Sequence, residues 1–202
     1  MEKQNKKQII CGIDEAGRGA LAGPLVAASV ILPCSVHKIS RRAKTKVKDG
    51  KLLSHKQRNR IYAVLKRLKA RIDVEVISAR QINNRGIGWA NRQSMRNLIK
   101  RSNAEKFIVD GRLKLGRIRG KTDKIKTMVD ADATVPETIL AGIVAKVYRD
   151  KIMRALHKQF PEYRWKSNAG YGTARHLEAI RTYNITYYHR NIFVTTALRN
   201  HP

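Results

Sequence analysis

Acidic residues are scarce in this chain, and several of them stand where they could do chemistry together. The sequence holds only 15 Asp and Glu among 202 residues. Asp14 and Glu15 follow one apolar run and precede a glycine-rich turn, and Asp110 closes a second run. Asp130 and Asp132 stand at the end of a third run, before a long helical pattern. Acids that follow strands beside glycine turns lie on one rim of an α/β sheet, so we expect the three clusters to converge.

Convergent carboxylates of this kind suit Mg²⁺ or Mn²⁺, which are hard cations that prefer oxygen ligands. Two such ions roughly 3.5–4 Å apart activate water and stabilise the leaving oxygen in phosphodiester cleavage. The alternative is that each acid caps a helix or balances a nearby Arg or Lys. Three clusters at predicted strand ends favour the metal site over that alternative.

The glycine-rich segment over residues 17–23, GRGALAG, is neither a Walker loop nor a dinucleotide fingerprint. Its functional interpretation is a close approach of the backbone to a sugar–phosphate chain. Main-chain amides would then act as donors, and Arg18 would add positive charge. A purely structural turn is the alternative.

The charge of the whole chain indicates an anionic partner. Lys and Arg number 43, which gives a formal net charge of +28. A hydrophobic fraction of 42% is too high for a disordered polycation, so we expect a folded domain. Nucleic acid is favoured as the partner, because each neutralised phosphate releases a condensed counterion. A membrane surface is the rival, but no amphipathic basic helix supports it.

The sequence also predicts where the protein resides. The longest apolar stretch, over residues 20–32, is too short and too interrupted to span a bilayer. The amino end lacks a signal-peptide pattern. We therefore expect a cytoplasmic protein in which Cys11 and Cys34 are buried, reduced thiols.

Hydrophobic periodicity predicts the elements that position these acids. Strands are expected over residues 8–13, 24–32, 71–77, 106–110 and 126–131. Helices are expected over residues 55–69 with Ser54 as N-cap, 89–100, 137–154 and 174–183. Residues 35–51 read as an irregular basic loop. The pattern indicates one α/β domain with a mixed sheet and a small helical C-terminal part.

The segment Ile13-Asp14-Glu15-Ala16-Gly17-Arg18-Gly19, continuing through Pro24, resembles the opening motif of ribonuclease HII, the type 2 ribonuclease H family. The resemblance covers nearly the whole chain. Further matching segments are 49–54, 109–111, Asp132 with 135–136, 143–147, 149–150, 170–173 with His176, 189–190 and Phe193.

Such a resemblance implies a ribonuclease H-like fold and an endoribonuclease that cuts the RNA strand of RNA–DNA hybrids. Cleavage 5′ to single ribonucleotides in duplex DNA, leaving 5′-phosphate and 3′-hydroxyl ends, is also implied. It further implies two divalent ions, Mg²⁺ or Mn²⁺, held by Asp14, Glu15, Asp110 and Asp132. On this basis we expect a basic tail (1–8), a catalytic domain (9–160) and a helical subdomain (161–202) that completes the substrate cleft.

Substrate contacts follow from the same resemblance. Gly17, Arg18 and Gly19 would read the 2′-hydroxyl, the group that distinguishes RNA from DNA. Tyr171 would stack at the deoxyribose after the ribonucleotide. Lys51 and Lys146 would bind backbone phosphates.

Five positions depart from the family pattern, and each removes an expected phosphate contact or adds negative charge: Gly50, Leu52, Asp130, Gly142 and Ala169. The expected ligands are untouched, so the departures bear on affinity and junction preference. Diffuse attraction by the high charge would offset the lost contacts, and we then expect a steep salt dependence of binding. Asp132 is preferred to Asp130 as the ligand.

Several roles stay open at this level. A non-catalytic nucleic-acid-binding protein and a hybrid nuclease without single-ribonucleotide activity are the competing functions. Packing or phosphate contact is preferred to base catalysis for His176 and His189, and Asp150 is expected in a helix-surface ion pair. We expect a monomer. A sliding clamp is a conceivable partner, although residues 195–202 show no evident clamp-binding peptide.

Overall fold

A five-stranded mixed sheet forms the centre of the computed structural model, which describes residues 8–200. The strand order is β3-β2-β1-β4-β5, with β1 antiparallel to β2 and parallel to β4. The strands are β1 (Ile10–Ala16), β2 (Leu25–Ile31), β3 (Arg71–Ile77), β4 (Lys106–Asp110) and β5 (Ile125–Met128). Most of the predicted basic tail, residues 1–7, lies outside the described residues.

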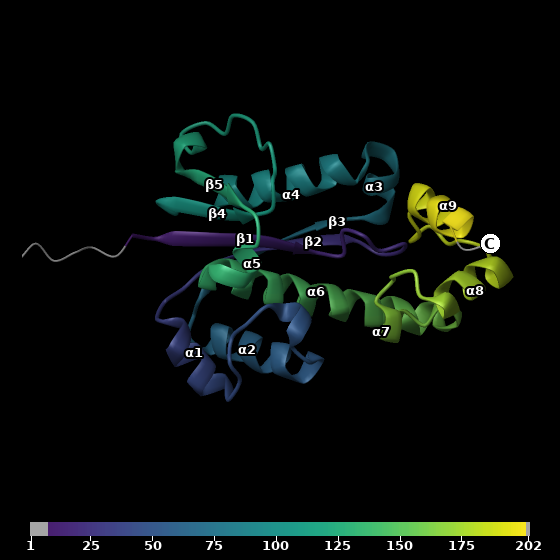
Figure 1. Cartoon of the computed structure of the whole chain (residues 1–202), viewed down its shortest axis with the longest axis horizontal. Helices are drawn as coiled ribbons and strands as arrows, with labels where there is room; N and C mark the ends of the chain where they lie inside the picture. Colours follow the sequence, from purple (N-terminus) through teal and green to yellow (C-terminus); the bar gives the residue numbers. More distant parts are fainter. Residues whose placement is uncertain (1–7, 201–202) are drawn as a thin grey trace, which may run out of the picture.

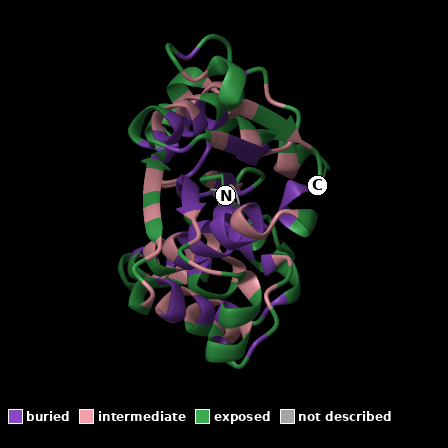
Figure 2. Ribbon diagram, turned by 90° about the vertical axis from the view of Figure 1, so that its left-hand side faces the viewer, coloured by how far each residue is buried: buried purple, intermediate pink, exposed green. Residues whose placement is uncertain are grey.

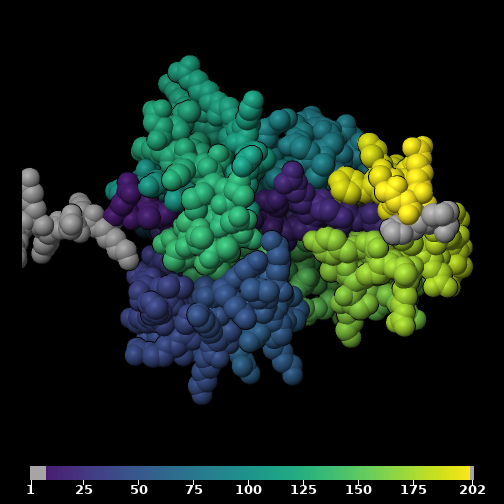
Figure 3. Space-filling view, in the orientation of Figure 1, coloured from purple at the N-terminus to yellow at the C-terminus, as the bar shows by residue number. Residues whose placement is uncertain are grey.

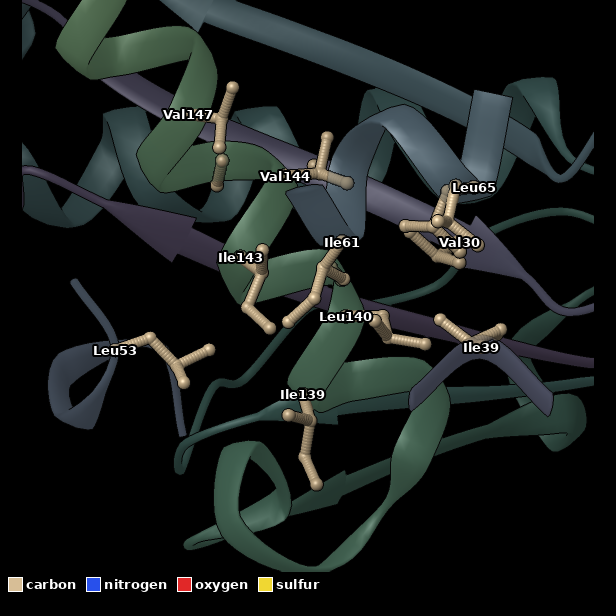
Figure 4. Packing of buried hydrophobic residues seen from close by; sticks show 14 of the residues in the cluster. Val30, Ile39, Leu53, Ile61, Leu65, Ile139, Leu140, Ile143, Val144 and Val147 are labelled. Atoms are coloured by element: carbon tan, nitrogen blue, oxygen red, sulfur yellow. The ribbon is translucent and has the colours of Figure 1, made fainter. Parts of the chain in front are cut away.

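Helices cover both faces of this sheet (Figure 1). On one face lies α6 (Pro136–Gln159), with α1 (Val36–Ala43) and α2 (His55–Arg67) packed beneath it. On the other face lie α3 (Ala79–Arg85) and α4 (Ile87–Arg101). Figure 4 shows Leu140 and Val144 of α6 among the apolar side chains of the first layer. Gly12 permits this packing, because a Cβ there would collide with the backbone of α6.

The C-terminal segment packs around a third apolar cluster centred on Trp165. Its elements are η3 (Pro161–Tyr163), α7 (Trp165–Asn168), α8 (Ala174–Tyr183) and α9 (Asn191–Asn200). The main-chain amides of Leu21 and Ala22 donate to the carbonyl of Gly170 at 2.8 and 3.1 Å, so this segment lies against the glycine-rich turn. The division at residue 160 into a domain and a subdomain remains a proposal.

The predicted mixed α/β architecture is confirmed, and most predicted elements are present. Figure 2 shows the buried residues gathered in the middle of the molecule. The predicted irregular loop over 35–51 is wrong, because it contains α1 and the short helix η1 (Gly50–Leu52). Only Ile39 and Ala43 of α1 are buried, so its apolar face is too small to stand out among basic residues. No helix within residues 8–200 has the length and apolar character needed to cross a membrane.

Candidate active site

Asp14 and Glu15 approach the site from the two faces of the sheet. Both lie within β1 rather than after it, so the prediction that they follow the strand is wrong by two residues. Neighbouring residues of a strand point to opposite faces. Asp14 is 4% exposed and lies against α6, whereas Glu15 accepts a hydrogen bond from the Asn91 amide of α4 at 3.5 Å.

Asp110 and Asp132 complete the set of acids. Asp110 ends β4, which pairs with β1 through Ile13 and Val109, and this register brings Asp110 beside Asp14. The Asp132 amide donates to Oδ1 of Asp110 at 3.3 Å.

The strand predicted over residues 126–131 ends early, and this changes the setting of Asp130 and Asp132. The strand stops at Met128, and Asp132 stands in the one-turn helix α5 (Ala131–Thr134). Asp130 is exposed in a left-handed conformation and does not line the cavity described below. The structure thus separates the two acids that the sequence places together.

Gly142 lets α6 approach Asp14. A Cβ at Gly142 would collide with Oδ2 of Asp14. One helical turn later, Lys146 extends along the same face, and a Cβ at Gly50 would lie 3.1 Å from its Cδ. Two of the departures from the family pattern, Gly50 and Gly142, therefore make room for Lys146 and Asp14.

The electrostatics of the site follow from burying acids near one another. Burial raises the pKa of the Asp14 carboxyl to about 8, assisted by Glu15 and Asp110 and opposed by Lys146. Burial likewise raises the pKa values of Glu15 and Asp110. The ammonium group of Lys51 lies 3.2 Å from Oδ2 of Asp132, and this hydrogen bond raises the pKa of the lysine. The site holds more negative charge than its lysines compensate.

One cavity of about 240 Å³ brings the predicted site residues together. Its lining comprises Asp14, Glu15, Ala16, Gly17, Arg18, Gly19, Lys51, Asp110, Asp132, Lys146 and Tyr171. All ten residues expected to bind metal or substrate are in this set.

The chemistry of this donor set fits a divalent cation. The four carboxylates offer only oxygen ligands, and a cation among them would offset their unfavourable burial. Within residues 8–200, no three acidic, histidine or cysteine side chains are already arranged as a metal site. Binding would therefore require the carboxylates to turn inward and Asp132 to exchange its contact with Lys51.

Two buried arginines, which sequence reasoning missed, hold the glycine-rich turn. Arg190 donates to the carbonyl of Arg18 at 2.9 Å and twice to that of Gly23. Arg149 donates to the carbonyls of Pro24, Ala22 and Ala169 at 2.9, 3.0 and 2.7 Å. Neither guanidinium has an acidic partner in the described part of the chain, so main-chain carbonyls carry the whole compensation.

Arg149 also links this turn to Tyr171. Gly17 has a φ of 87°, and a Cβ there would collide with the Arg149 side chain. The Arg149 guanidinium lies 5.4 Å from the centroid of the Tyr171 ring, which is a cation–π distance. Tyr171 remains 42% exposed. Its ring is therefore held from behind and open to a ligand.

Arg58 was also missed, and it positions the turn that carries Lys51. Its Nη1 donates to the carbonyls of Gly50 and Leu53 at 3.1 and 2.6 Å. Its Nη2 lies 2.9 Å from Oδ2 of Asp150 on α6. The ion pair expected for Asp150 exists, but its partner comes from α2 rather than from the same helix.

His176 and His189 pack inside the C-terminal segment and do not line the cavity. Both are fully buried. His176 accepts a hydrogen bond from the Trp165 indole at 3.0 Å, and its other ring nitrogen contacts the carbonyl of Tyr171 at 2.9 Å. Burial lowers the pKa of His189 to about 4. The preferred packing role is confirmed over base catalysis.

Comparison with known proteins points to one family. A family model described as Ribonuclease HII matches residues 11–196. The Ribonuclease HII of Ehrlichia chaffeensis is 36% identical over 191 residues, which cover 94% of this chain and 87% of that protein. The ribonuclease H2 of Pyrococcus horikoshii has a TM-score of 0.74 at 22% identity, covering 95% of this chain and 97% of that one. The ribonuclease HII of Archaeoglobus fulgidus, solved in complex with PCNA, has a TM-score of 0.72 at 25% identity, covering 90% and 93%.

Proposed function

The chain belongs to the ribonuclease HII family and is a ribonuclease H acting on RNA–DNA hybrids, and we propose that it also cuts 5′ to single ribonucleotides in duplex DNA. The proposed reaction is hydrolysis with two divalent ions that leaves 5′-phosphate and 3′-hydroxyl ends. The observation that carries the proposal is the shared cavity, in which four carboxylates adjoin the glycine turn, two lysines and Tyr171.

The proposed roles follow from the position of each side chain. Asp14, Glu15, Asp110 and Asp132 would hold Mg²⁺ or Mn²⁺. These ions, when bound, supply the activation of water and the stabilisation of the leaving 3′ oxygen. Lys51 would leave Asp132 and bind a backbone phosphate instead.

Recognition of the ribonucleotide is assigned to the braced parts of the site. The main chain of residues 17–19 approaches the 2′-hydroxyl, and rigid support by Arg149 and Arg190 fixes its position. Tyr171 stacks on the following deoxyribose with its exposed ring. Lys146 binds a second phosphate.

The test compares end-labelled duplexes that contain no ribonucleotide, one, or four in a row, with Mg²⁺, Mn²⁺ or EDTA. The proposal expects metal-dependent cleavage 5′ to the single ribonucleotide, and no cleavage of the all-DNA duplex. Cleavage of the four-ribonucleotide duplex alone would mean a hybrid nuclease without junction activity. Binding without cleavage would favour the non-catalytic protein.

A monomeric state and a clamp partner are separate proposals. The Archaeoglobus fulgidus relative is in complex with PCNA, so a sliding clamp is the partner class to test. Co-migration of this chain with a clamp in size-exclusion chromatography would support the contact. The elution of the chain alone reports its oligomeric state.

A further inference from the structure

The segment that joins β4 to β5 is the second basic feature near the cavity. Residues 111–124 carry six cations and a single acid, Asp123. The segment begins directly after Asp110, which lines the cavity. Its cations are Arg112, Lys114, Arg117, Arg119, Lys121 and Lys124.

This segment is fixed to the body of the protein. Leu115 and Ile118 are buried in the apolar cluster beneath α4. The Lys121 ammonium donates to three main-chain carbonyls at the end of α4, those of Ile99, Lys100 and Ser102, at 2.9, 2.8 and 2.6 Å. Arg96 of α4 donates to the carbonyls of Leu115 and Arg117. The segment is thus held in place without using its outward cations.

Four cations remain on the outer side of this segment: Arg112, Lys114, Arg117 and Arg119. All four are exposed, and none forms an ion pair within residues 8–200. Only four ion pairs form in that part of the chain, although the net charge is +28. Fixed like charges repel one another, and a polyanion lying on them would remove that repulsion.

The path of the segment suits a nucleic acid backbone. Because β4 and β5 are parallel, the chain must return from the carboxyl ends of the strands to their amino ends. The paired stretch Phe107–Asp110 spans roughly 10 Å at about 3.3 Å per residue. That length matches about three base pairs of duplex at 3.4 Å each. Figure 3 shows the segment projecting at the upper left of the face whose centre carries α5.

We propose that Arg112, Lys114, Arg117 and Arg119 form a binding surface for the sugar–phosphate backbone of the duplex, outside the cleavage cavity. This surface, here named the β4–β5 cation surface, extends the contact from the rim at Asp110 along the edge of the sheet. The proposal rests on the proposed function, because it takes the cavity as the place where the ribonucleotide lies. It assigns part of the high charge to a defined contact.

The test neutralises the surface and compares it with a matched set. One variant changes Arg112, Lys114, Arg117 and Arg119 to Gln. The control changes Arg42, Lys44, Arg60 and Arg67 to Gln, which also removes three arginines and one lysine. The control residues are exposed and line a separate cavity of about 340 Å³ between α1 and α2. Thermal unfolding establishes that both variants are folded.

Binding of a ribonucleotide-containing duplex is measured by fluorescence anisotropy in EDTA, between about 50 and 200 mM salt. Each phosphate contact contributes about 0.9 to the slope of log affinity against log salt, so the surface variant should lose about 3 to 4 in slope. Its affinity at about 0.1 M salt should fall at least tenfold. The control should keep the wild-type slope.

An unchanged slope in the surface variant, or equal losses in both variants, would overturn the proposal in favour of diffuse attraction. Cleavage kinetics separate this outcome from failure of the proposed function. If both proposals hold, the surface variant has a raised KM and an unchanged kcat. If wild type cuts no substrate, the function fails, while the salt slopes still report on the surface.

Discussion

The guanidinium of Arg149 lies 5.4 Å from the centroid of the Tyr171 ring, while its nitrogens donate to Pro24, Ala22 and Ala169. One buried side chain of α6 thus ties the glycine-rich turn to the aromatic ring across the cavity. The arrangement predicts that recognition of a single ribonucleotide depends on Arg149 as well as on the residues that touch the substrate.

Arg149→Lys should therefore impair recognition and stability together. A lysine cannot reach all three carbonyls, and each buried acceptor left without a donor costs about 1–3 kcal/mol. We expect unfolding free energy to fall by about 2–4 kcal/mol. Cleavage at one ribonucleotide should fall more than cleavage of a long hybrid. Arg154→Lys on the same helix is the control, and equal losses on both substrates would contradict the account.

Gly142→Ser tests the contact between α6 and Asp14. It restores the residue that the family commonly has, yet its Cβ would collide with Oδ2 of Asp14. Because that oxygen ends a side chain that can turn, we expect the fold to survive. Displacement of a reacting group by about 1 Å costs up to about 100-fold, so kcat should fall by about ten- to hundredfold. Gly88→Ala, in open space on α4, is the matched control. Full activity of Gly142→Ser would show that Asp14 need not occupy this position.

Arg58 and Lys51 should act as a unit. Arg58→Ala releases the turn that carries Lys51, so removing both side chains should cost little more in kcat/KM than removing Lys51 alone. Arg60→Ala, exposed on the same helix, should leave kcat/KM unchanged. Additive losses in the double variant would mean that Arg58 does not act through Lys51.

His189 makes stability depend on pH. Because burial lowers its folded pKa from 6.5 to about 4, the unfolded chain binds the proton first as the pH falls. Its stabilising contribution is therefore complete above pH 6.5 and is lost as the pH falls towards 4. The slope is at most about 1.4 kcal/mol per pH unit for one proton. Urea unfolding of wild type and His189→Gln between these limits should differ by this slope, because other titrating groups cancel. Parallel curves would contradict the assignment.

The sequence predicts the acids of the site better than it predicts their support. Asp14, Glu15 and Asp110 stand in or at apolar strands, and that pattern is visible without the fold. Asp132 is found through the motif around it, whereas the strand assigned to it is wrong. A one-turn helix has no periodicity to detect, so α5 could not be predicted from pattern alone.

The bracing arginines could not be found by the same reasoning. Arg149 and Arg190 are two of 43 cations, and a cation in sequence is normally a surface charge. Their partners are main-chain carbonyls at Ala22, Gly23 and Pro24, more than 120 residues away along the chain. Carbonyls carry no sequence signal. One hint was available, because Arg149 follows a nearly continuous apolar stretch of α6.

The central claim is that the four carboxylates around Asp14 form the cleavage centre, and Asp14→Asn tests it most directly. The variant removes a buried charge whose pKa is already raised to about 8, so thermal unfolding should occur at or above the wild-type temperature. The measurement is cleavage of a duplex with one ribonucleotide, in Mg²⁺ or Mn²⁺, by both proteins. We predict a metal-dependent cut 5′ to the ribonucleotide by wild type and none by the folded variant. Wild-type cleavage by Asp14→Asn would place the chemistry elsewhere.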